Sequence, residues 1–405
     1  MELSSFFEDF LSKESIFSDK SVLETSYMPE TMPHRAEQIH QIASILAPVL
    51  KMEKPSNLFI YGKPGSGKTL SIKHISGEIK KVSLEKNINV KIVYLNCKLK
   101  KISDTEYRLI ARLASEFGRE IPPTGLPTEE AYKVFYSAIE AEKAIIILIF
   151  DEIDQLSKKA GDDILYNLTR INEELKNTKV SLVGISNDLV FVDSLDPRVK
   201  SSLSEEEVIF PAYNAVQLKD ILKMRADKAF KKDTLAEGVI EKCAAYSARE
   251  HGDSRRALEL LRVSGEVAER SGSSVVQLRH VDEAEEKLEK DRVVETVKTQ
   301  PKQHQIILYA TILAHANEKS KLIFTGEIYE IYKKLCYKTK FRPLTQRRFS
   351  DIISEFDMLG VITAKIISKG RYGRTREISV PQTLLLPKIK NMLEEEIGLR
   401  SSLSS

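Results

Sequence analysis

The sequence predicts an α/β fold on a parallel five-stranded sheet, then an all-helical domain and a C-terminal winged helix. Three observations support this order. Five short strand-like runs alternate with helical stretches before residue 211, residues 215–291 carry a helical pattern without a convincing strand, and residues 303–380 read as three helices followed by two strands. A chain of 405 residues is too long for one core. The expected divisions are an N-terminal arm (1–25), the α/β core (26–210), the helical domain (211–296) and the winged helix (297–405).

Composition indicates a globular chain, and the sequence shows no pattern typical of a membrane span, a disulfide framework or a zinc site. Hydrophobic residues make up 42% and charged residues 30%. The longest apolar run, residues 144–150, is too short to span a bilayer, and the N-terminus carries acids where a signal peptide needs basic residues. We therefore expect cytoplasmic residence and no membrane partner. The three cysteines are odd in number and far apart, and the seven histidines lack ligand spacing, so neither disulfides nor a zinc site is indicated.

The strand-like runs define the predicted sheet. Most are continuous apolar or β-branched segments rather than alternating ones, which is typical of parallel strands buried on both faces by crossover helices. The expected strands are residues 58–61, 90–95, 145–150, 181–186 and 208–210.

A glycine-rich loop follows the first strand, in the segment NLFIYGKPGSGKT. Gly62, Gly67, Lys68 and Thr69 satisfy the G-x-x-x-x-G-K-[ST] pattern, in which backbone N–H groups cradle phosphates, the lysine reaches the β/γ-phosphates and the hydroxyl ligates Mg²⁺. A helix expected over residues 68–82 adds its positive N-terminal end. The predicted nucleotide contacts in this loop are Gly62, Pro64, Gly65, Ser66, Gly67, Lys68, Thr69 and Leu70.

Two acids end the third expected strand, and an amide ends the fourth. A buried strand that stops at Asp151 and Glu152 delivers carboxylates to the edge of the sheet where α/β ligands bind. We expect Asp151 to hold Mg²⁺ and Glu152 to deprotonate the attacking water. Asn187 could hold that water or sense the γ-phosphate, although an asparagine after a strand is usually a turn residue. An α/β ATPase core is the prediction.

Two arginines are candidates for reading the γ-phosphate. Arg198, in Asp196-Pro-Arg198, could act as an arginine finger on a neighbouring molecule's nucleotide, or it could pair with Asp196 or face solvent; both interpretations stay open. Arg255 follows a Gly-Asp turn that caps a helix. A cation in the first helical turn is unfavourable unless an anion lies nearby, and the nucleotide phosphates are the expected anion.

Two further segments of the core carry candidate contacts. The double-proline stretch that contains Tyr27, His34 and Arg35 resists helix and could wall an adenine, or it could be an ordinary connector. The passage 98–143 is longer than one crossover requires and looks like an inserted helical hairpin, with helices at 104–117 and 128–141. Its arginines could contact a partner or be solvated; they are Arg108, Arg112 and Arg119.

The C-terminal region is expected to bind DNA. Residues 301–380 carry 15 Lys and Arg against 7 Asp and Glu. The third helix, expected over 345–359, would enter the major groove, and the basic hairpin tip would meet the minor groove or its phosphates. A winged helix that binds protein is the alternative. The predicted DNA contacts are Thr345, Gln346, Arg347, Arg348, Lys369, Arg371, Tyr372 and Arg374.

These motifs together resemble the archaeal replication initiators related to the largest subunit of the eukaryotic origin recognition complex and to the helicase-loading factor, all of the AAA+ class. The resemblance runs from Tyr27 to the C-terminal helix. It implies Walker A at residues 62–69, Walker B at Asp151 and Glu152, sensor 1 at Asn187 and sensor 2 at Arg255. It also implies that residues 27–35 and Tyr213 flank the adenine and that Arg108 and Arg112 contact DNA.

The resemblance implies a function as well. The expected protein is a DNA replication initiator that binds double-stranded origin DNA under the control of ATP/ADP and Mg²⁺, hydrolyses ATP slowly as a switch, and is nucleoid-associated. The expected partners are the replicative helicase and paralogous initiators. An AAA+ winged-helix transcriptional regulator and a clamp-loader-like ATPase are the alternatives.

Overall fold

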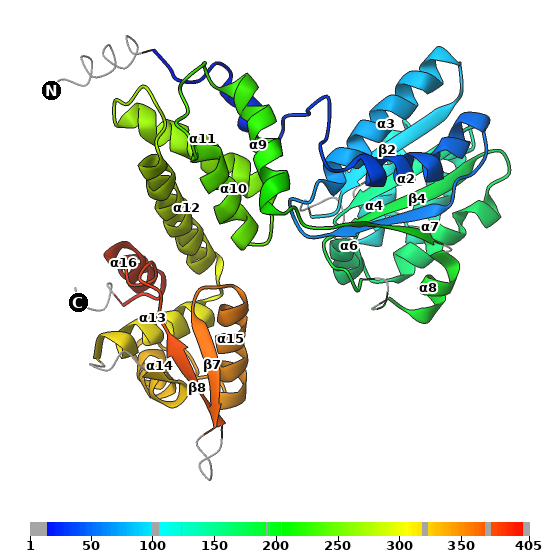
Figure 1. The fold of residues 1–405 in the computed structure, drawn as a ribbon. Coiled ribbons are helices and arrows are strands. Elements are labelled where there is room, and N and C mark those ends of the chain that lie inside the picture. Colours follow the sequence, from blue (N-terminus) through cyan, green and yellow to red (C-terminus); the bar gives the residue numbers. More distant parts are fainter. Residues whose placement is uncertain are drawn as a thin grey trace. The chain divides into compact units, whose positions relative to one another are not determined.

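The computed structural model of the chain forms two compact units, Met1–Val281 and Asp282–Ser405 (Figure 1). The structure describes residues 14–98, 105–122, 124–191, 193, 195–203, 205–317, 323–368 and 374–399. Among these residues, no helix has the length and apolar character that a membrane crossing requires.

The first unit is built on a five-stranded sheet in the order β2-β3-β4-β1-β5, with every neighbouring pair parallel. All five predicted strands are confirmed. β5 starts three residues earlier than expected because the acids at its start sit in an edge strand, where charged side chains are tolerated. The strands are β1 (Asn57–Gly62), β2 (Val90–Asn96), β3 (Ile145–Asp151), β4 (Lys179–Ser186) and β5 (Glu205–Phe210).

Helices cover both faces of this sheet. In β3, Ile147 belongs to the same hydrophobic cluster as α2 (Ala36–Leu46) and α3 (Lys68–Glu85), whereas its neighbour Leu148 belongs to the cluster formed with the helices of the other face. Alternate side chains of a strand point to opposite faces, so this strand is buried on both sides, as its continuous apolar run predicts. The helices of the other face are α4 (Glu106–Glu116), α5 (Thr128–Ile139), α6 (Ile153–Ala160), α7 (Asp163–Glu174) and α8 (Pro197–Leu203).

The two helices of the long passage after β2 are part of this covering layer. Helices were expected there, and α4 and α5 confirm them. Leu109 and Leu113 of α4 and Phe135 of α5 are fully buried in the cluster that covers the sheet. The two helices of the expected insert therefore pack onto the sheet, because their apolar stripes are buried in the cluster that covers it.

The helical domain packs around an N-terminal segment. It consists of α9 (Ala215–Ala229), α10 (Val239–Arg249), α11 (Ser254–Arg270) and the start of α12 (Leu278–Thr299), which continues into the second unit. Asn214 caps the start of α9, and its side chain forms a capping box with Gln217. The described residues of the domain are helical as predicted, apart from isolated bridges of Phe230 with Phe17 and of Leu235 with Val276.

The described part of the N-terminal arm is firmly docked on the helical domain. Ile16, Phe17, Val22 and Leu23 are buried, the last two in the short helix η1 (Lys20–Leu23). The Phe17 ring lies 4.7 Å from that of Phe230. Residues 1–25 mix polar and aromatic residues without clear periodicity, which predicts a tail or a loosely docked arm. Residues 15–25 are docked instead, because their apolar side chains complete the core of the helical domain.

The second unit confirms the winged helix. The helices are α13 (Lys302–Asn317), α14 (Thr325–Lys338), α15 (Gln346–Met358) and α16 (Pro387–Glu396), and the strands are β6 (Ile323–Phe324), β7 (Thr363–Ser368) and β8 (Arg374–Ser379). The strands form an antiparallel sheet in the order β6-β8-β7. The two-residue β6 carries too little pattern for a sequence-based prediction. Phe349, Ile352, Ile353 and Phe356 form the buried face of α15.

Candidate nucleotide and DNA sites

Lys68 is the centre of the candidate nucleotide site. It opens α3 directly after the glycine-rich loop, and its residue is 5% exposed. The ammonium donates to the carbonyl oxygens of Gly62 (2.6 Å) and Lys63 (3.0 Å) and to Oδ1 of Asn187 (2.9 Å). The end of β4 and the loop after β1 thus meet at one cation, as the parallel sheet order requires.

The surroundings of Lys68 favour the arrival of an anion. Burial and the positive charge of Arg255 lower the pKa of Lys68 to about 8, although Asp151 and Asp253 act in the opposite direction. A phosphate placed here would offset both effects on the pKa, because a nearby negative charge favours the charged form of Lys68 and attracts Arg255. Lys68 and Arg255, predicted from separate motifs, therefore share one electrostatic environment.

Asp151 is held by three donors at the end of β3. Its Oδ2 accepts from Oγ1 of Thr69 (2.9 Å) and from the hydroxyl of Tyr94 (2.5 Å), and its Oδ1 accepts from the backbone N–H of Glu152 (3.0 Å). The structure brings together the hydroxyl and carboxylate predicted for Mg²⁺. Tyr94 was missed, because nothing in β2 marks one residue as facing this edge. Burial and the bond to Asp151 raise the pKa of Tyr94.

Glu152 occupies a left-handed backbone position. Its φ is 56°, it precedes α6, and its side chain lies 3.8 Å from the ammonium of Lys98. A non-glycine residue in this region is strained, and such strain gathers at functional sites. The geometry turns the chain sharply after β3, so that Asp151 and Glu152 leave the strand in different directions.

The helical domain touches the glycine-rich loop directly. The hydroxyl of Ser254 donates to the carbonyl oxygen of Gly65 at 2.7 Å. Asp253 caps α11 by accepting from the N–H of Arg255 (2.8 Å). A Cβ added to Gly65 would lie 1.7 Å from Oδ1 of Asp253, so the close approach requires glycine. The side chain of Arg255 itself is exposed.

Arg35 holds the outer side of the loop. It is 1% exposed, donates through Nε to the carbonyl oxygen of Ser66 (2.8 Å) and through a terminal nitrogen to that of Pro211 (2.5 Å), and lies 3.8 Å from the Tyr213 ring centroid. A Cβ on Gly67 would lie 2.9 Å from the hydroxyl of Tyr213. Arg35 and Tyr213 therefore support the phosphate loop, a role that sequence reasoning did not assign.

The other residues of the double-proline segment contact α9. The His34 ring lies 2.8 Å from Oδ2 of Asp220, and the guanidinium of Arg225 lies 4.4 Å from the Tyr27 ring centroid. These contacts fasten the segment to the helical domain. The adenine contact expected of Tyr27 and His34 stays a prediction.

Arg198 pairs with Asp196, which is one of the two interpretations that the sequence allows. Its guanidinium binds both carboxylate oxygens of Asp196 at 3.1 Å, and its side chain is 70% exposed. Hydrogen bonding to Arg198 lowers the pKa of Asp196. A role on a neighbouring molecule stays a prediction.

The predicted DNA contacts at the start of α15 share one exposed turn. Thr345 caps the helix by accepting from the N–H of Arg348, and all four predicted residues of this turn are exposed. Arg348 also pairs with Glu355 at 3.1 Å. In the hairpin, Lys369, Arg371 and Tyr372 lie outside the described residues, as does the side chain of Arg374.

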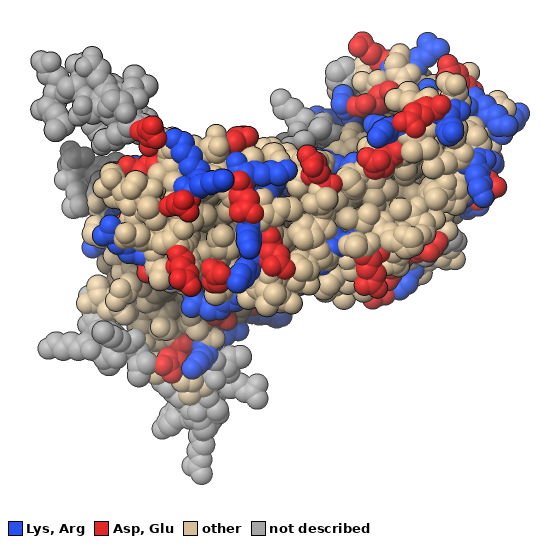
Figure 2. Space-filling model, turned by 45° about the horizontal axis from the view of Figure 1, so that its top comes forward, with Lys and Arg blue, Asp and Glu red and all other residues tan. Residues whose placement is uncertain are grey.

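Arg108 and Arg112 are exposed on α4, where Arg112 pairs with Glu116 at 2.5 Å. Figure 2 shows one face of the molecule, on which basic and acidic side chains of the coloured residues are intermixed rather than gathered into a patch of one sign.

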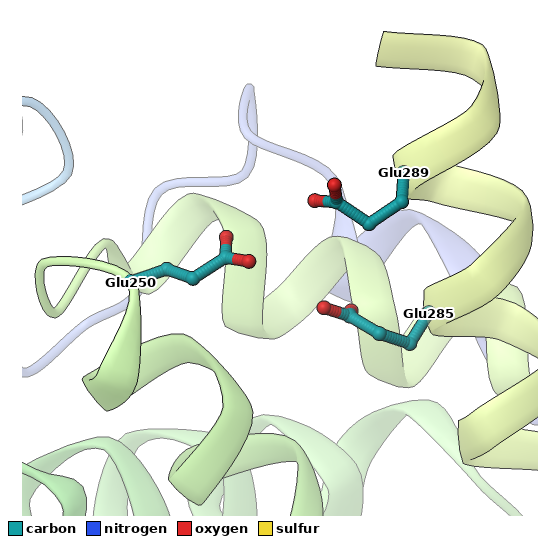
Figure 3. A group of neighbouring side chains, drawn as sticks. All are labelled: Glu250, Glu285 and Glu289. Atoms are coloured by element: carbon teal, nitrogen blue, oxygen red, sulfur yellow. The ribbon is translucent and has the colours of Figure 1, made fainter. Parts of the chain in front are cut away.

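Figure 3 draws three further glutamates, which the nucleotide site does not include. Glu285 and Glu289 project from α12, four residues apart, and belong to the second unit. Glu250 follows α10 in the first unit, where its Oε2 lies 2.7 Å from Nε of Arg256. We assign no shared site to these three residues.

The chain combines a phosphate loop, an acidic strand end, a winged helix and a helical domain that contacts the loop, which we call the lid. This combination defines the class of AAA+ ATPases with a C-terminal winged helix. Family models agree with each part. Residues 51–190 match an AAA domain, residues 219–286 the Cdc6 AAA+ ATPase-type lid domain, and residues 295–384 the CDC6 C-terminal winged helix domain.

Full-length relatives narrow the class to one family. The chain is 51% identical over 406 residues to an ORC1-type DNA replication protein of Thermococcus onnurineus, covering 99% of this chain and 96% of that protein. It is 51% identical over 379 residues to the ORC1-type DNA replication protein 1 of Methanosarcina acetivorans, covering 93% and 91%. The chain belongs to the archaeal ORC1-type DNA replication proteins.

A solved structure agrees. The Aeropyrum pernix ORC1 protein, determined in complex with DNA, is 42% identical and superimposes with a TM-score of 0.81, covering 95% of this chain and 98% of that chain. The resemblance expected from the motifs is thereby confirmed.

Proposed function

We propose that this protein is a replication initiator that binds double-stranded origin DNA and changes its DNA-bound state with the bound nucleotide. Family membership supports the initiator role, and the Aeropyrum pernix relative was determined with DNA. The observation that carries the nucleotide control is the contact between Ser254 of the lid and Gly65 of the phosphate loop. Because the lid rests on the loop backbone, a phosphate that reshapes the loop also moves the lid.

The residues of the loop fit a nucleotide with Mg²⁺. Lys68 is a buried cation without a direct carboxylate partner among its hydrogen bonds, and an anionic phosphate satisfies it. Thr69 and Asp151 would hold the metal, which supplies neutralisation of phosphate charge when bound. Tyr94 fixes the orientation of the Asp151 carboxylate.

Hydrolysis would depend on Glu152 and Asn187. Glu152 accepts a proton from the attacking water, and Asn187, which already contacts Lys68, positions that water at the γ-phosphate. Arg255 stabilises charge on the same phosphate from the lid. We propose a slow, switch-like ATPase, because a lid already seated on the loop registers the state of the nucleotide without repeated turnover.

DNA would be bound by the exposed first turn of α15, by the hairpin that follows β7, and by Arg108 and Arg112. The replicative helicase and paralogous initiators are the proposed protein partners, and the protein would be associated with chromosomal DNA.

Footprinting of chromosomal fragments with ATP and with ADP tests the proposal. We expect discrete protected sites at replication origins whose boundaries differ between the two nucleotides, and a Lys68→Ala variant whose footprint no longer responds. Protection at promoters alone would favour the transcriptional regulator. Rapid DNA-stimulated turnover by a ring would favour the clamp-loader-like ATPase.

A further inference from the structure

Two aromatic rings are exposed where α14 ends and the turn toward α15 begins. Tyr337 is 77% exposed and Phe341 38% exposed, although both belong to a domain with a well-packed apolar core. Within the described residues, neither ring belongs to that core or forms a ring contact. The two rings lie close together in the sequence and leave aromatic faces exposed, on which another ring can stack.

The turn that presents these rings is rigidly anchored. The N–H of Phe341 donates to the carbonyl oxygen of Cys336 (2.9 Å), and the side-chain amide of Gln303 donates to the carbonyl oxygen of Arg342 (3.0 Å). The N–H of Leu344 donates to the hydroxyl of Tyr332 (2.9 Å). Since the backbone is bonded on both sides of the rings, the turn keeps them at the surface.

The same turn carries unpaired positive charge. Lys338, Lys340 and Arg342 are exposed and form no ion pair with the part of the chain that the structure describes, unlike Lys333, which pairs with Glu330 at 2.8 Å. A cation at the C-terminal end of α14 also complements the helix dipole, and this accounts for Lys338. It does not account for Lys340, Arg342 or the two rings.

We propose that this turn binds single-stranded DNA, with unpaired bases stacked on Tyr337 and Phe341 and phosphates held by Lys338, Lys340 and Arg342. Exposed aromatic rings interleaved with cations form the surface on which unpaired bases stack, whatever their sequence. A duplex keeps its base faces covered by neighbouring pairs, so rings of this kind gain little from it. The proposal extends the DNA binding proposed above and gives the initiator a contact for a strand that has left the duplex.

The test uses the full-length protein and three fluorescent probes: a 25-nucleotide oligo-dT, an oligonucleotide of the same length with abasic sites, and a 25-base-pair duplex. Removing both rings, in Tyr337→Ser/Phe341→Ser, should weaken oligo-dT binding about 10-fold or more, because stacking on each ring is lost. Binding of the abasic probe and of the duplex should stay unchanged. The matched control is Met358→Ser, since Met358 is 80% exposed at the far end of α15.

A direct readout is available because the chain contains no tryptophan. Tyr337→Trp places the sole indole at the turn, and we expect oligo-dT to quench its fluorescence, whereas Met358→Trp should not respond. Unchanged oligo-dT affinity without quenching would overturn the proposal, as would an equal loss on the abasic probe, which would mean phosphate contact alone. Failure of the wild type to bind duplex would instead contradict the proposed function. The oligo-dT result would still test the single-strand proposal, because it does not depend on duplex binding.

Discussion

Asp253 and Gly65 lie so close together that a Cβ on Gly65 would be 1.7 Å from the Asp253 carboxylate oxygen. The contact joins the first turn of the lid helix α11 to the middle of the phosphate loop, and the hydroxyl of Ser254 reinforces it at 2.7 Å. Gly65 also has a φ of 70°, a conformation that other residues resist. The lid is therefore in direct contact with the element that holds the phosphates.

Replacing Gly65 by Ala should separate the lid from the loop and abolish nucleotide binding, because the new methyl group overlaps Asp253 and the backbone is strained. Titration with a fluorescent ADP analogue checks the loss. Gly77→Ala is the matched control: it lies in α3 with nothing within 4 Å of an added Cβ, and the helix propensity of alanine should stabilise it by about 1 kcal/mol. Normal nucleotide affinity in Gly65→Ala would contradict the coupling.

Lys68 should make the stability of the nucleotide-free protein rise at alkaline pH. Its pKa is about 8 in the folded chain, against 10.5 ordinarily. Between these values the unfolded chain binds more protons, so the free energy of unfolding increases with pH in that window. Relative to Lys68→Met, the wild type should gain about 3 kcal/mol from pH 8 to pH 10.5. Urea unfolding of both proteins measures the difference, and parallel pH profiles would exclude a lowered pKa.

Nucleotide affinity should show the opposite pH trend. A bound phosphate restores the charge of Lys68, so above pH 8 binding must take up a proton and the affinity falls by up to about tenfold per pH unit. Calorimetric titrations with ATP at constant Mg²⁺, between pH 7.5 and 9.5 and in buffers of different ionisation enthalpy, detect both the decline and the proton. A constant Kd over this range would contradict a lowered pKa of Lys68 in the nucleotide-free protein.

Arg347→Ala should weaken duplex binding and lower the slope of log affinity against log salt by about 0.9, the effect of one lost phosphate contact. Arg348→Ala should cost less affinity, because Glu355 already pairs with Arg348 at 3.1 Å. Anisotropy titrations at several salt concentrations provide the slopes. The control is Arg170→Ala on α7, an exposed arginine paired with Glu173, which should leave the slope unchanged. An unaltered slope in Arg347→Ala would favour a protein-binding winged helix.

Gly265→Ala should loosen the N-terminal segment. A Cβ at this position of α11 would lie 2.4 Å from the Phe17 ring, and such overpacking typically costs about 1–3 kcal/mol. We expect a lower Tm and faster proteolysis before residue 25. Gly326→Ala, in α14 with nothing within 4 Å, is the control. Protection equal to that of the wild type would mean that Phe17 repacks without loss.

Much of the fold and part of the site follow from local sequence. The strand ends that carry Gly62 and Asp151 are marked by apolar runs broken by glycine or acids, and these signals depend only on covalently adjacent residues. The strand boundary that shifted most, at β5, lies where Glu205 pairs with Asn57 of β1. An edge strand tolerates charged side chains, so these acidic residues can belong to it. Only the assembled sheet shows that β5 lies at the edge.

The sequence by itself determined the phosphate loop and the acidic strand end, because each is a contiguous pattern whose chemistry requires particular residue types at fixed spacing. It also determined the winged helix, because local periodicity marks its helices and strands. Only the tertiary structure decided which distant groups meet there. It placed Tyr94 on Asp151, Arg35 on the carbonyl of Ser66, and Asp253 against Gly65. These neighbours are set by strand order, register and helix packing, which join residues far apart in the chain and leave no local pattern.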